Sequence, residues 1–306
     1  FKARHLQMDR VVALKVIHRK LCQDEKQVQR FEQEARTSSK LHHPNSIRVF
    51  DYGTGDDGRL YMAMELLRGV TLGKLITRER TLEPPRVIHI ARQMLKSLAE
   101  AHDRGLVHRD LKPENIFVCE IFGETDFVKV LDFGIAKAIG PTEEQVNLTQ
   151  TGFICGTPRY LSPEQALGQE VDGRADLYSV GVLMYEMLTG RPPFIGENHI
   201  SIVMKHVHDE PPPLRLSGRH GEAGQKVAWL VERLLEKNPD ALNKQDDNGK
   251  TALIWASAPV IRCVAGSMKI FISPCGPETS STLAAAPESS LPSVTEVIFA
   301  CGMSPN

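Results

Sequence analysis

The stretch that decides the fold is "VHRDLKPENIFV", residues 107–118. Its polar part carries Asp110, Lys112 and Asn115 within a few positions, between apolar residues on both sides. A carboxylate, an ammonium group and an amide therefore lie together just before "NIFV", which is typical of a short buried strand. The arrangement raises the question of why the chain brings these three polar side chains together just where a buried strand begins; a purely structural loop is the alternative to a functional one.

The composition is ordinary for a soluble globular protein and excludes several classes of function. Of 306 residues, 41% are hydrophobic and 25% are charged, which suits a two-lobed domain or two small ones. The net charge of -1 predicts no binding to nucleic acid. Six cysteines without a C-x-x-C spacing argue against a disulfide framework and a zinc site. With no signal peptide and no membrane span, we expect a cytoplasmic protein.

The pattern of apolar residues predicts strands early in the chain and helices later. Strands are predicted at residues 10–18, 46–53, 59–67, 115–118 and 127–131. Helices are predicted at residues 24–41, 84–105, 176–188 and 227–239. This order favours an α+β fold with a small sheet-rich lobe followed by a larger helical lobe.

Four motifs follow one another in a recognisable order. "VALK" (12–15) precedes "HRDLKPEN" (108–115), and "LDFG" (131–134) and "SPE" (162–164) come after it. With these motifs the chain resembles the Hanks-type serine/threonine protein kinases of bacteria. The resemblance covers roughly residues 1–240 and implies the two-lobed protein kinase fold.

The resemblance also implies a phosphoryl-transfer site, where positioning and charge neutralisation supply most of the catalysis. Asp110 would accept or orient the proton of the attacking hydroxyl, and Lys112 would neutralise the γ-phosphate of ATP. Asn115 and Asp132 would bind Mg²⁺, a hard cation that prefers oxygen ligands. Lys15 would hold the α- and β-phosphates.

An adenine pocket is expected between the two lobes. Glu34, on the predicted helix 24–41, is the expected partner of Lys15. By resemblance, "MELL" (64–67) is the hinge and Met64 is the gatekeeper. The other expected adenine contacts are backbone groups of Glu65 and Leu67 and the side chains of Ala13 and Phe117. A plain core position explains Phe117 equally well.

The segment between "LDFG" and "SPE" is expected to control activity. Thr149 and Thr151 are candidate phosphorylation sites, and Arg109 would pair with a phosphate there. A pair of solvated loop threonines is the alternative. Thr157 resembles the family's substrate-facing threonine and favours serine or threonine substrates. Asp176, at the start of a buried helix, is expected to tether the backbone of the catalytic loop.

Two features depart from the kinase pattern. The chain starts at Phe1, just after the place where the family's G-x-G-x-x-G loop would end. We therefore expect an N-terminally truncated kinase that lacks the first strand and the glycine-rich loop, with weak ATP binding. After "LLEKNP" (234–239), no arginine stands where the family has the partner of Glu164.

The sequence changes character after residue 240. "NKQDDNGKTALIWA" (243–256) is similar to the start of an ankyrin repeat, and a degenerate fusion, a sequence junction or chance could explain it. The stretch is a candidate surface for a protein partner. The expected domains are an incomplete kinase N-lobe (1–67), a C-lobe with an incomplete end (68–240), an ankyrin-like half-repeat (241–256) and a low-complexity, disordered tail (257–306).

Two hypotheses about function follow. The first is an enzyme that uses ATP and Mg²⁺ to phosphorylate Ser or Thr of protein substrates in bacterial signalling. The second is a catalytically weak or silent kinase-like module that binds other proteins. Intact Lys15, Asp110, Asn115 and Asp132 favour the enzyme, because a scaffold has no need of all four.

Overall fold

The computed structural model describes residues 1–6, 9–16, 25–121, 123–133, 158–216, 221–237, 261–264 and 267–270. Contacts within the chain separate residues 1–273 from residues 274–306, and every element described below belongs to the first unit. The expected ankyrin-like half-repeat lies outside the described residues, as does most of the expected tail.

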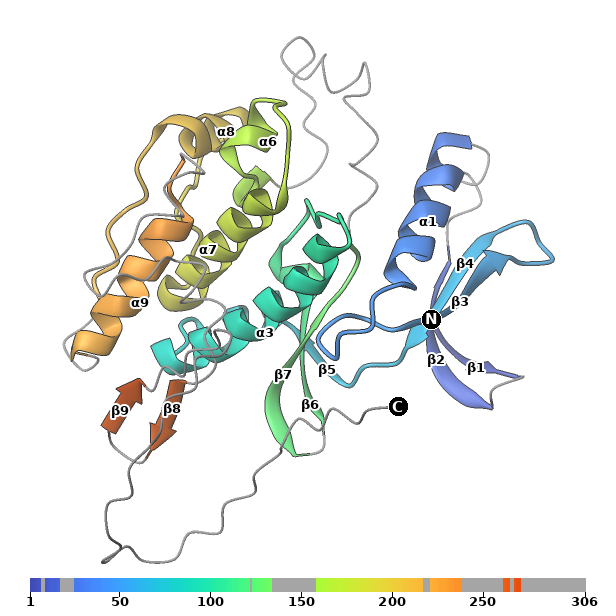
Figure 1. Cartoon of the computed structure of the whole chain (residues 1–306). Helices are drawn as coiled ribbons and strands as arrows, with labels where there is room; N and C mark the ends of the chain where they lie inside the picture. Colours follow the sequence, from blue (N-terminus) through green and yellow to red (C-terminus); the bar gives the residue numbers. More distant parts are fainter. Residues whose placement is uncertain are drawn as a thin grey trace, which may run out of the picture. The chain divides into compact units, whose positions relative to one another are not determined.

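The N-terminal lobe is an antiparallel sheet with one helix packed against it (Figure 1). In spatial order its strands are β1 (Lys2–His5), β2 (Arg10–Val16), β4 (Leu60–Glu65) and β3 (Val49–Thr54). The helix is α1 (Glu25–Ser38). Phe31 and Ala35 of α1 are buried against Leu60 and Met62, which the alternation of side chains places on one face of β4. This cluster forms the core of the small lobe.

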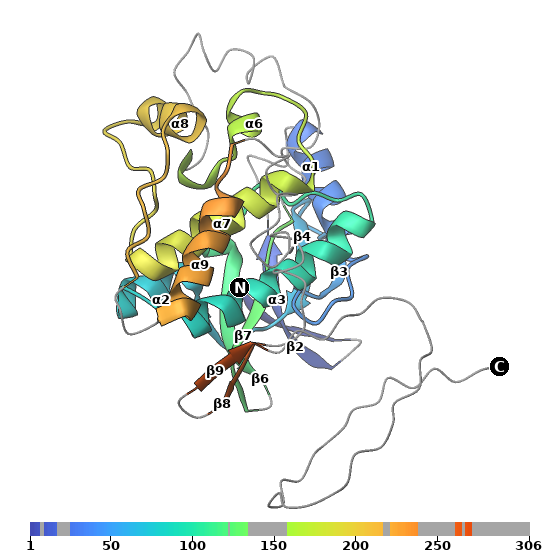
Figure 2. The same cartoon turned by 60° about the vertical axis from the view of Figure 1, so that its left-hand side comes forward.

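The larger lobe is built around α7 (Gly173–Thr189), a helix buried on almost every side. The helices α3 (Pro84–Asp103) and α9 (Gly221–Leu234) pack against it (Figure 2). Gly181 of α7 permits the close approach of α9, because a Cβ at this position would lie 2.7 Å from Leu234 Cβ. The apolar face predicted for α3 is fully buried in the same core.

Shorter elements complete the chain and carry the functional loops. A second antiparallel sheet has the order β5 (Gly69–Thr71), β6 (Ile116–Ile121) and β7 (Glu124–Val130). The short helices are α2 (Leu72–Glu79), η2 (Pro113–Asn115), η4 (Pro158–Tyr160), α6 (Pro163–Ala166) and α8 (His199–His208). A hairpin of β8 (Ile261–Val264) and β9 (Ser267–Ile270) lies in the range expected to be a disordered tail.

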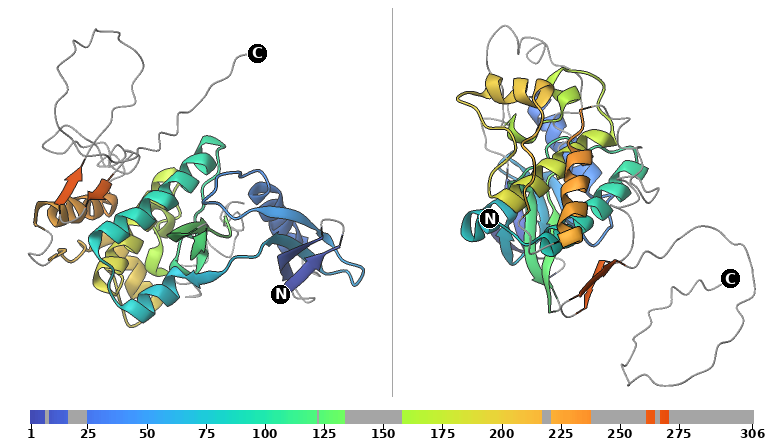
Figure 3. Two further views of the ribbon diagram at one scale, coloured as in Figure 1. Left: turned by 90° about the horizontal axis from the view of Figure 1, so that it is seen from below. Right: turned by 90° about the vertical axis from the view of Figure 1, so that its left-hand side faces the viewer.

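The predicted α+β organisation is confirmed, since the sheet-rich lobe precedes the helical one (Figure 3). The longer predicted strands and helices appear as β2, β3, β4, α1, α3, α7 and α9. The sequence does not predict β1, β5 or α2, because such short elements show no clear apolar period.

Backbone hydrogen bonds join the small lobe to strand β7 of the larger one. Ile47 N–H donates to the Val130 carbonyl at 2.9 Å, and Val130 N–H donates to the Asn45 carbonyl at 2.7 Å. A largely buried ion pair lies beside them, with Lys129 Nζ 2.6 Å from Glu65 Oε1. Because β7 leads directly to Asp132, these contacts fix the position of Asp132 relative to the small lobe.

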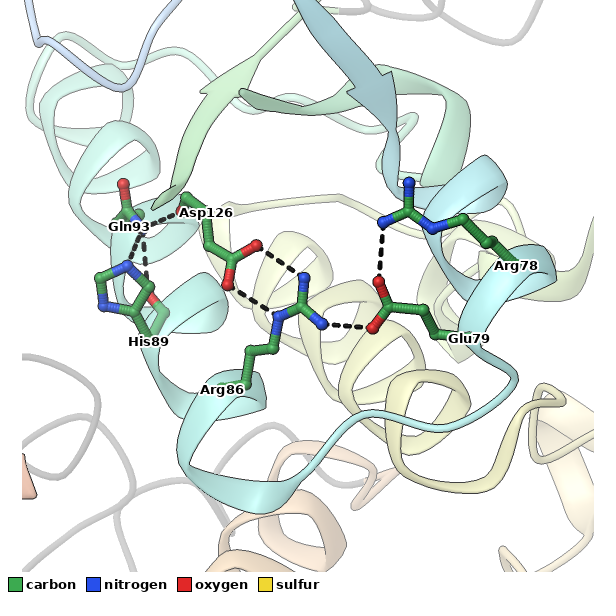
Figure 4. Close-up of polar contacts among 6 residues, drawn as sticks. All are labelled: Arg78, Glu79, Arg86, His89, Gln93 and Asp126. Atoms are coloured by element: carbon green, nitrogen blue, oxygen red, sulfur yellow. Dashed lines mark hydrogen bonds and ion pairs between the residues drawn. The ribbon is translucent and has the colours of Figure 1, made fainter. Parts of the chain in front are cut away.

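The other end of β7 is held by a cluster of charged side chains from α2 and α3 (Figure 4). Arg86 donates from Nε and Nη2 to the two carboxylate oxygens of Asp126, at 2.7 and 2.8 Å. Its Nη1 also pairs with Glu79, which accepts from Arg78 at 2.7 Å. The carboxylates raise the pKa of Arg86, so this guanidinium stays charged. Gln93 adds a bond from Nε2 to the Asp126 carbonyl at 2.8 Å.

We expect Arg86→Ala to destabilise the fold by about 2 kcal/mol, because it removes a bidentate, charge-assisted pair that is two-thirds buried. The matched control is Arg59→Ala, which removes a contact to Asp57 where both side chains are about half exposed. This control should cost at most about 0.5 kcal/mol. Urea unfolding of both variants measures the difference, and equal losses would contradict the expectation.

Candidate active site

Asp176, in the first turn of α7, holds the catalytic loop. Its fully buried carboxylate accepts the backbone N–H groups of His108 and Arg109, each at 2.8 Å. His102 Nε2 lies 2.7 Å from Oδ2 of the same carboxylate. The predicted tether is therefore confirmed, and His102 is a further partner that the sequence does not indicate.

Within the loop, Lys112 and Asn115 both converge on Asp110. Lys112 Nζ lies 2.7 Å from Asp110 Oδ2. Asn115 Nδ2 donates to the Asp110 carbonyl at 2.9 Å and to Oδ2 at 3.3 Å. The Asp110 side chain remains 30% exposed, so a substrate hydroxyl can reach it.

Asp132 lies beside this loop. The Leu131 N–H donates to the Asn115 carbonyl at 2.8 Å, and His108 Nε2 donates to the Leu131 carbonyl at 2.9 Å. Asp132 has a left-handed backbone with φ of 42°, an uncommon conformation for a non-glycine residue. Its Oδ1 lies 2.9 Å from Lys15 Nζ. The structure thus brings together three motifs that are far apart in the sequence.

The predicted pair between Lys15 and Glu34 stays a prediction. Glu34 belongs to helix α1, but its side chain lies outside the described residues. The side chains of Lys15 and Asp132 are 34% and 42% exposed, so a phosphate group could approach both.

The residues expected around adenine lie on strands of both lobes. Ala13 of β2 is opposite Met64 of β4, and Met64 packs on the core cluster beneath α1. Phe117 lies half-buried on β6, and Leu67 lies half-buried just after β4. Contacts of these residues with a nucleotide remain predictions.

One backbone group of Glu65 is already hydrogen-bonded to another residue. Its N–H donates to the Arg48 carbonyl at 3.0 Å, so this group is already hydrogen-bonded within the protein. The Glu65 side chain accepts from the Arg48 N–H at 2.9 Å and pairs with Lys129. The sequence gives no sign of this side-chain pairing.

Asp132 and Asn115 together suit a magnesium ion. Because Asn115 Nδ2 donates to Asp110, its Oδ1 is the atom left to act as a ligand. Asp132 supplies a carboxylate, and Mg²⁺ commonly binds one or two such oxygens together with phosphate and water. In the described part of the chain, no group of three or more His, Cys, Asp or Glu is arranged for a metal.

Arg109 has a left-handed backbone, with φ of 63°, and both its N–H and its carbonyl are hydrogen-bonded to side chains. Its N–H donates to Asp176 and its carbonyl accepts from Gln165 Nε2 at 2.9 Å. Gln165, from α6, is thus a link to the catalytic loop that the sequence does not reveal. Thr149, Thr151 and Thr157 lie outside the described residues, so their predicted roles are not tested.

Comparison with known proteins now assigns the family. A model of the protein kinase domain matches residues 1–241. The chain belongs to the protein kinase family. Serine/threonine-protein kinase pkn3 of Myxococcus xanthus is 47% identical over 239 residues, which cover 78% of this chain and 44% of that protein. Serine/threonine-protein kinase PknB of Mycolicibacterium smegmatis is 40% identical over 242 residues, covering 78% of this chain and 37% of that protein.

The kinase-family chain spans less than half the length of these two relatives. None of the helices in its described part combines the length and the apolar character that crossing a membrane requires.

Proposed function

We propose that this chain carries the catalytic domain of a bacterial serine/threonine protein kinase, which transfers the γ-phosphate of ATP to Ser or Thr of protein substrates. The observation that carries the proposal is the convergence of Lys15 and Asp132 with the Asp110 loop. A cation, two carboxylates and an amide from separate elements meet there, as phosphoryl transfer requires. The identity to serine/threonine kinases supports the same reaction.

In the proposed mechanism, Asp110 orients the incoming hydroxyl and accepts its proton. Lys112, whose ammonium group already lies at Asp110 Oδ2, neutralises negative charge that builds up on the transferred group. Lys15 positions the α- and β-phosphates. Asp132 and Asn115 would hold Mg²⁺, which would supply positive charge to the phosphates when bound. Asp176 contributes by holding the loop backbone in place.

The finer assignments belong to the same proposal. We propose a role in signalling in the cytoplasm, phosphorylation at Thr149 or Thr151 that is sensed by Arg109, and a substrate-facing Thr157. A protein partner for the ankyrin-like stretch is also a proposal.

The test is the intact mass of the purified chain after incubation with Mg²⁺ and ATP, beside an Asp132→Asn control. Phosphate on the parent but not on the control would support the kinase, and peptide mapping should then place it at Thr149 or Thr151. If neither chain gains mass and neither phosphorylates an added protein, the chain is catalytically silent and the binding-module hypothesis replaces the proposal.

A further inference from the structure

A fully buried histidine, His206 of α8, lies outside the machinery described so far. Its Nε2 is 3.0 Å from the Arg159 carbonyl of η4, and its Nδ1 is 2.9 Å from the Tyr178 hydroxyl of α7. The ring also makes edge contacts with Tyr178 and Phe194, at centroid distances of 5.7 and 4.8 Å. One side chain therefore joins α8 and α7 to η4.

The two hydrogen bonds define the state of the ring. A backbone carbonyl only accepts, so Nε2 carries the proton and donates to Arg159. Nδ1 must then be the acceptor, and the Tyr178 hydroxyl donates to it. This is a neutral imidazole, and burial agrees with it by lowering the pKa of His206 to about 4.

The segment that His206 holds is fixed on its other side by α7. Ser179 Oγ donates to the Tyr160 carbonyl at 2.8 Å, and the Tyr160 hydroxyl donates to Glu186 Oε2 at 2.9 Å. Two successive carbonyls of η4, at Arg159 and Tyr160, thus have side-chain donors from two different helices. Such paired attachment leaves η4 little freedom to shift.

The same segment continues to the catalytic loop. Shortly after η4, Gln165 of α6 donates to the Arg109 carbonyl at 2.9 Å, one residue before Asp110. A displacement of η4 would therefore disturb the backbone next to Asp110, the residue that is proposed to orient the substrate hydroxyl. Because Gln165 attaches this segment beside Asp110, residues 158–162 border the place where a Ser or Thr of a protein substrate would approach.

From these contacts we infer that His206 is a positioning residue for the protein substrate. By donating to the Arg159 carbonyl and accepting from Tyr178, it keeps residues 158–162 in the place where the substrate chain lies next to Asp110. The inference rests on the proposed kinase function. It concerns the protein substrate, because the contacts of His206 with the described residues include none of those proposed to bind ATP.

The kinetic test compares His206→Leu, His206→Gln and His208→Leu, with myelin basic protein as the probe substrate. His206→Leu keeps an apolar side chain but loses both hydrogen bonds, and should lower kcat/KM for the probe by about tenfold. The KM for ATP should stay within about twofold. His206→Gln can donate with Nε2 and accept with Oε1, so it should recover most of the loss. His208 is exposed on the same helix and is the matched control.

The hydrogen-exchange rate of the backbone amides of residues 158–166 is a second measurement, and it does not depend on activity. Exchange there should quicken in His206→Leu but not in His208→Leu. If His206→Leu does not fold, Tyr178→Phe removes one of the two hydrogen bonds and should show the same pattern more weakly. An unchanged kcat/KM for the probe would overturn the positioning role. So would a rise in the KM for ATP as large as the fall in kcat/KM for the probe. Absence of transfer by the parent chain would overturn the proposed function as well.

The neutral state of His206 also predicts a dependence of stability on pH. The groups that face it are Tyr178, Phe194 and the Arg159 carbonyl, together with Lys237, which lowers the pKa further. Glu164 lies near the Tyr178 hydroxyl and, after burial, helps to raise the pKa of that phenol. No carboxylate in direct contact with His206 is present among the described residues to stabilise a proton on the ring.

The direction of this pH dependence follows from the pKa of His206 in the folded and in the unfolded chain. The pKa of His206 falls from its ordinary value of 6.5 to about 4 in the fold, so below pH 6.5 the unfolded chain takes up the proton first. Its contribution to stability is present above pH 6.5 and is lost as the pH falls toward 4. Between these values, the unfolding constant of the parent should rise relative to His206→Gln by up to about tenfold per pH unit. Urea midpoints at about pH 7.5 and about pH 5.5 measure this, and parallel shifts in both chains would contradict it.

Discussion

Replacing Asp110 with Asn is expected to slow phosphoryl transfer by about 10² to 10⁴-fold, the usual contribution of a positioned general base. Asn has nearly the same shape, and its amide oxygen can still accept from Lys112 and Asn115, so the loop should keep its geometry. What is lost is the carboxylate that orients the hydroxyl and takes its proton. The fall should therefore appear in kcat, with little change in the KM for ATP.

The matched control is Asp103→Asn, which removes the same charge from an exposed position at the end of α3. It should leave both constants unchanged. Single-turnover transfer of labelled phosphate, with excess enzyme, separates the chemical step from product release. Transfer by Asp110→Asn within about threefold of the parent would remove Asp110 from the mechanism, because general base catalysis is worth far more than that.

The fold class and the centre of the site could be predicted because their signals are local. Asp110, Lys112 and Asn115 belong to one short loop, and their contacts with one another follow from that closeness. The long helices show a clear apolar period, so α3 and α7 are visible in the sequence. Asp176 could be predicted too, but only by resemblance, since nothing near it in the chain shows what it contacts.

The contacts that escaped prediction join residues far apart in the sequence. Lys129 is one lysine in an apolar strand, and its pairing with Glu65 depends on how β7 meets the small lobe. His206 lies on a helix with a mixed surface, and only the packing of α7 and η4 gives its nitrogens two partners. The sequence near such a residue does not identify the groups that its side chain contacts.

The ion pair between Glu65 and Lys129 is the second place where a large effect is expected. Lys129 is the more deeply buried partner, with 9% of its side chain exposed against 23% for Glu65. Within the described residues, Lys129 also donates to one neutral acceptor, the Ser46 carbonyl at 3.3 Å. Glu65, in contrast, also accepts from the Arg48 N–H at 2.9 Å and reaches solvent. The Lys129 ammonium group therefore depends more on this ion pair than the Glu65 carboxylate does.

We expect Glu65→Gln to destabilise the fold by about 3 kcal/mol, since it leaves a buried ammonium group without a countercharge. Lys129→Met should cost only about 1 to 2 kcal/mol, because the remaining carboxylate keeps a backbone donor and water. The double variant should be more stable than Glu65→Gln alone, as expected when a buried pair is replaced as a whole. Arg4→Met, which breaks an exposed pair with Asp9, is the control and should cost about 0.5 kcal/mol or less.

Urea unfolding without nucleotide gives the stabilities of the parent, the two single variants and the double variant. The double-mutant cycle built from them gives the coupling between the two side chains. The order of the single variants decides the physical cause. If Lys129→Met costs more than Glu65→Gln, the Glu65 carboxylate is the charge that needs its partner more, because methionine keeps most of the aliphatic stem and removes only the ammonium group. If Glu65→Gln costs more and the second substitution restores stability, the junction of the two lobes is held by a charge that the interior tolerates only in the presence of its partner.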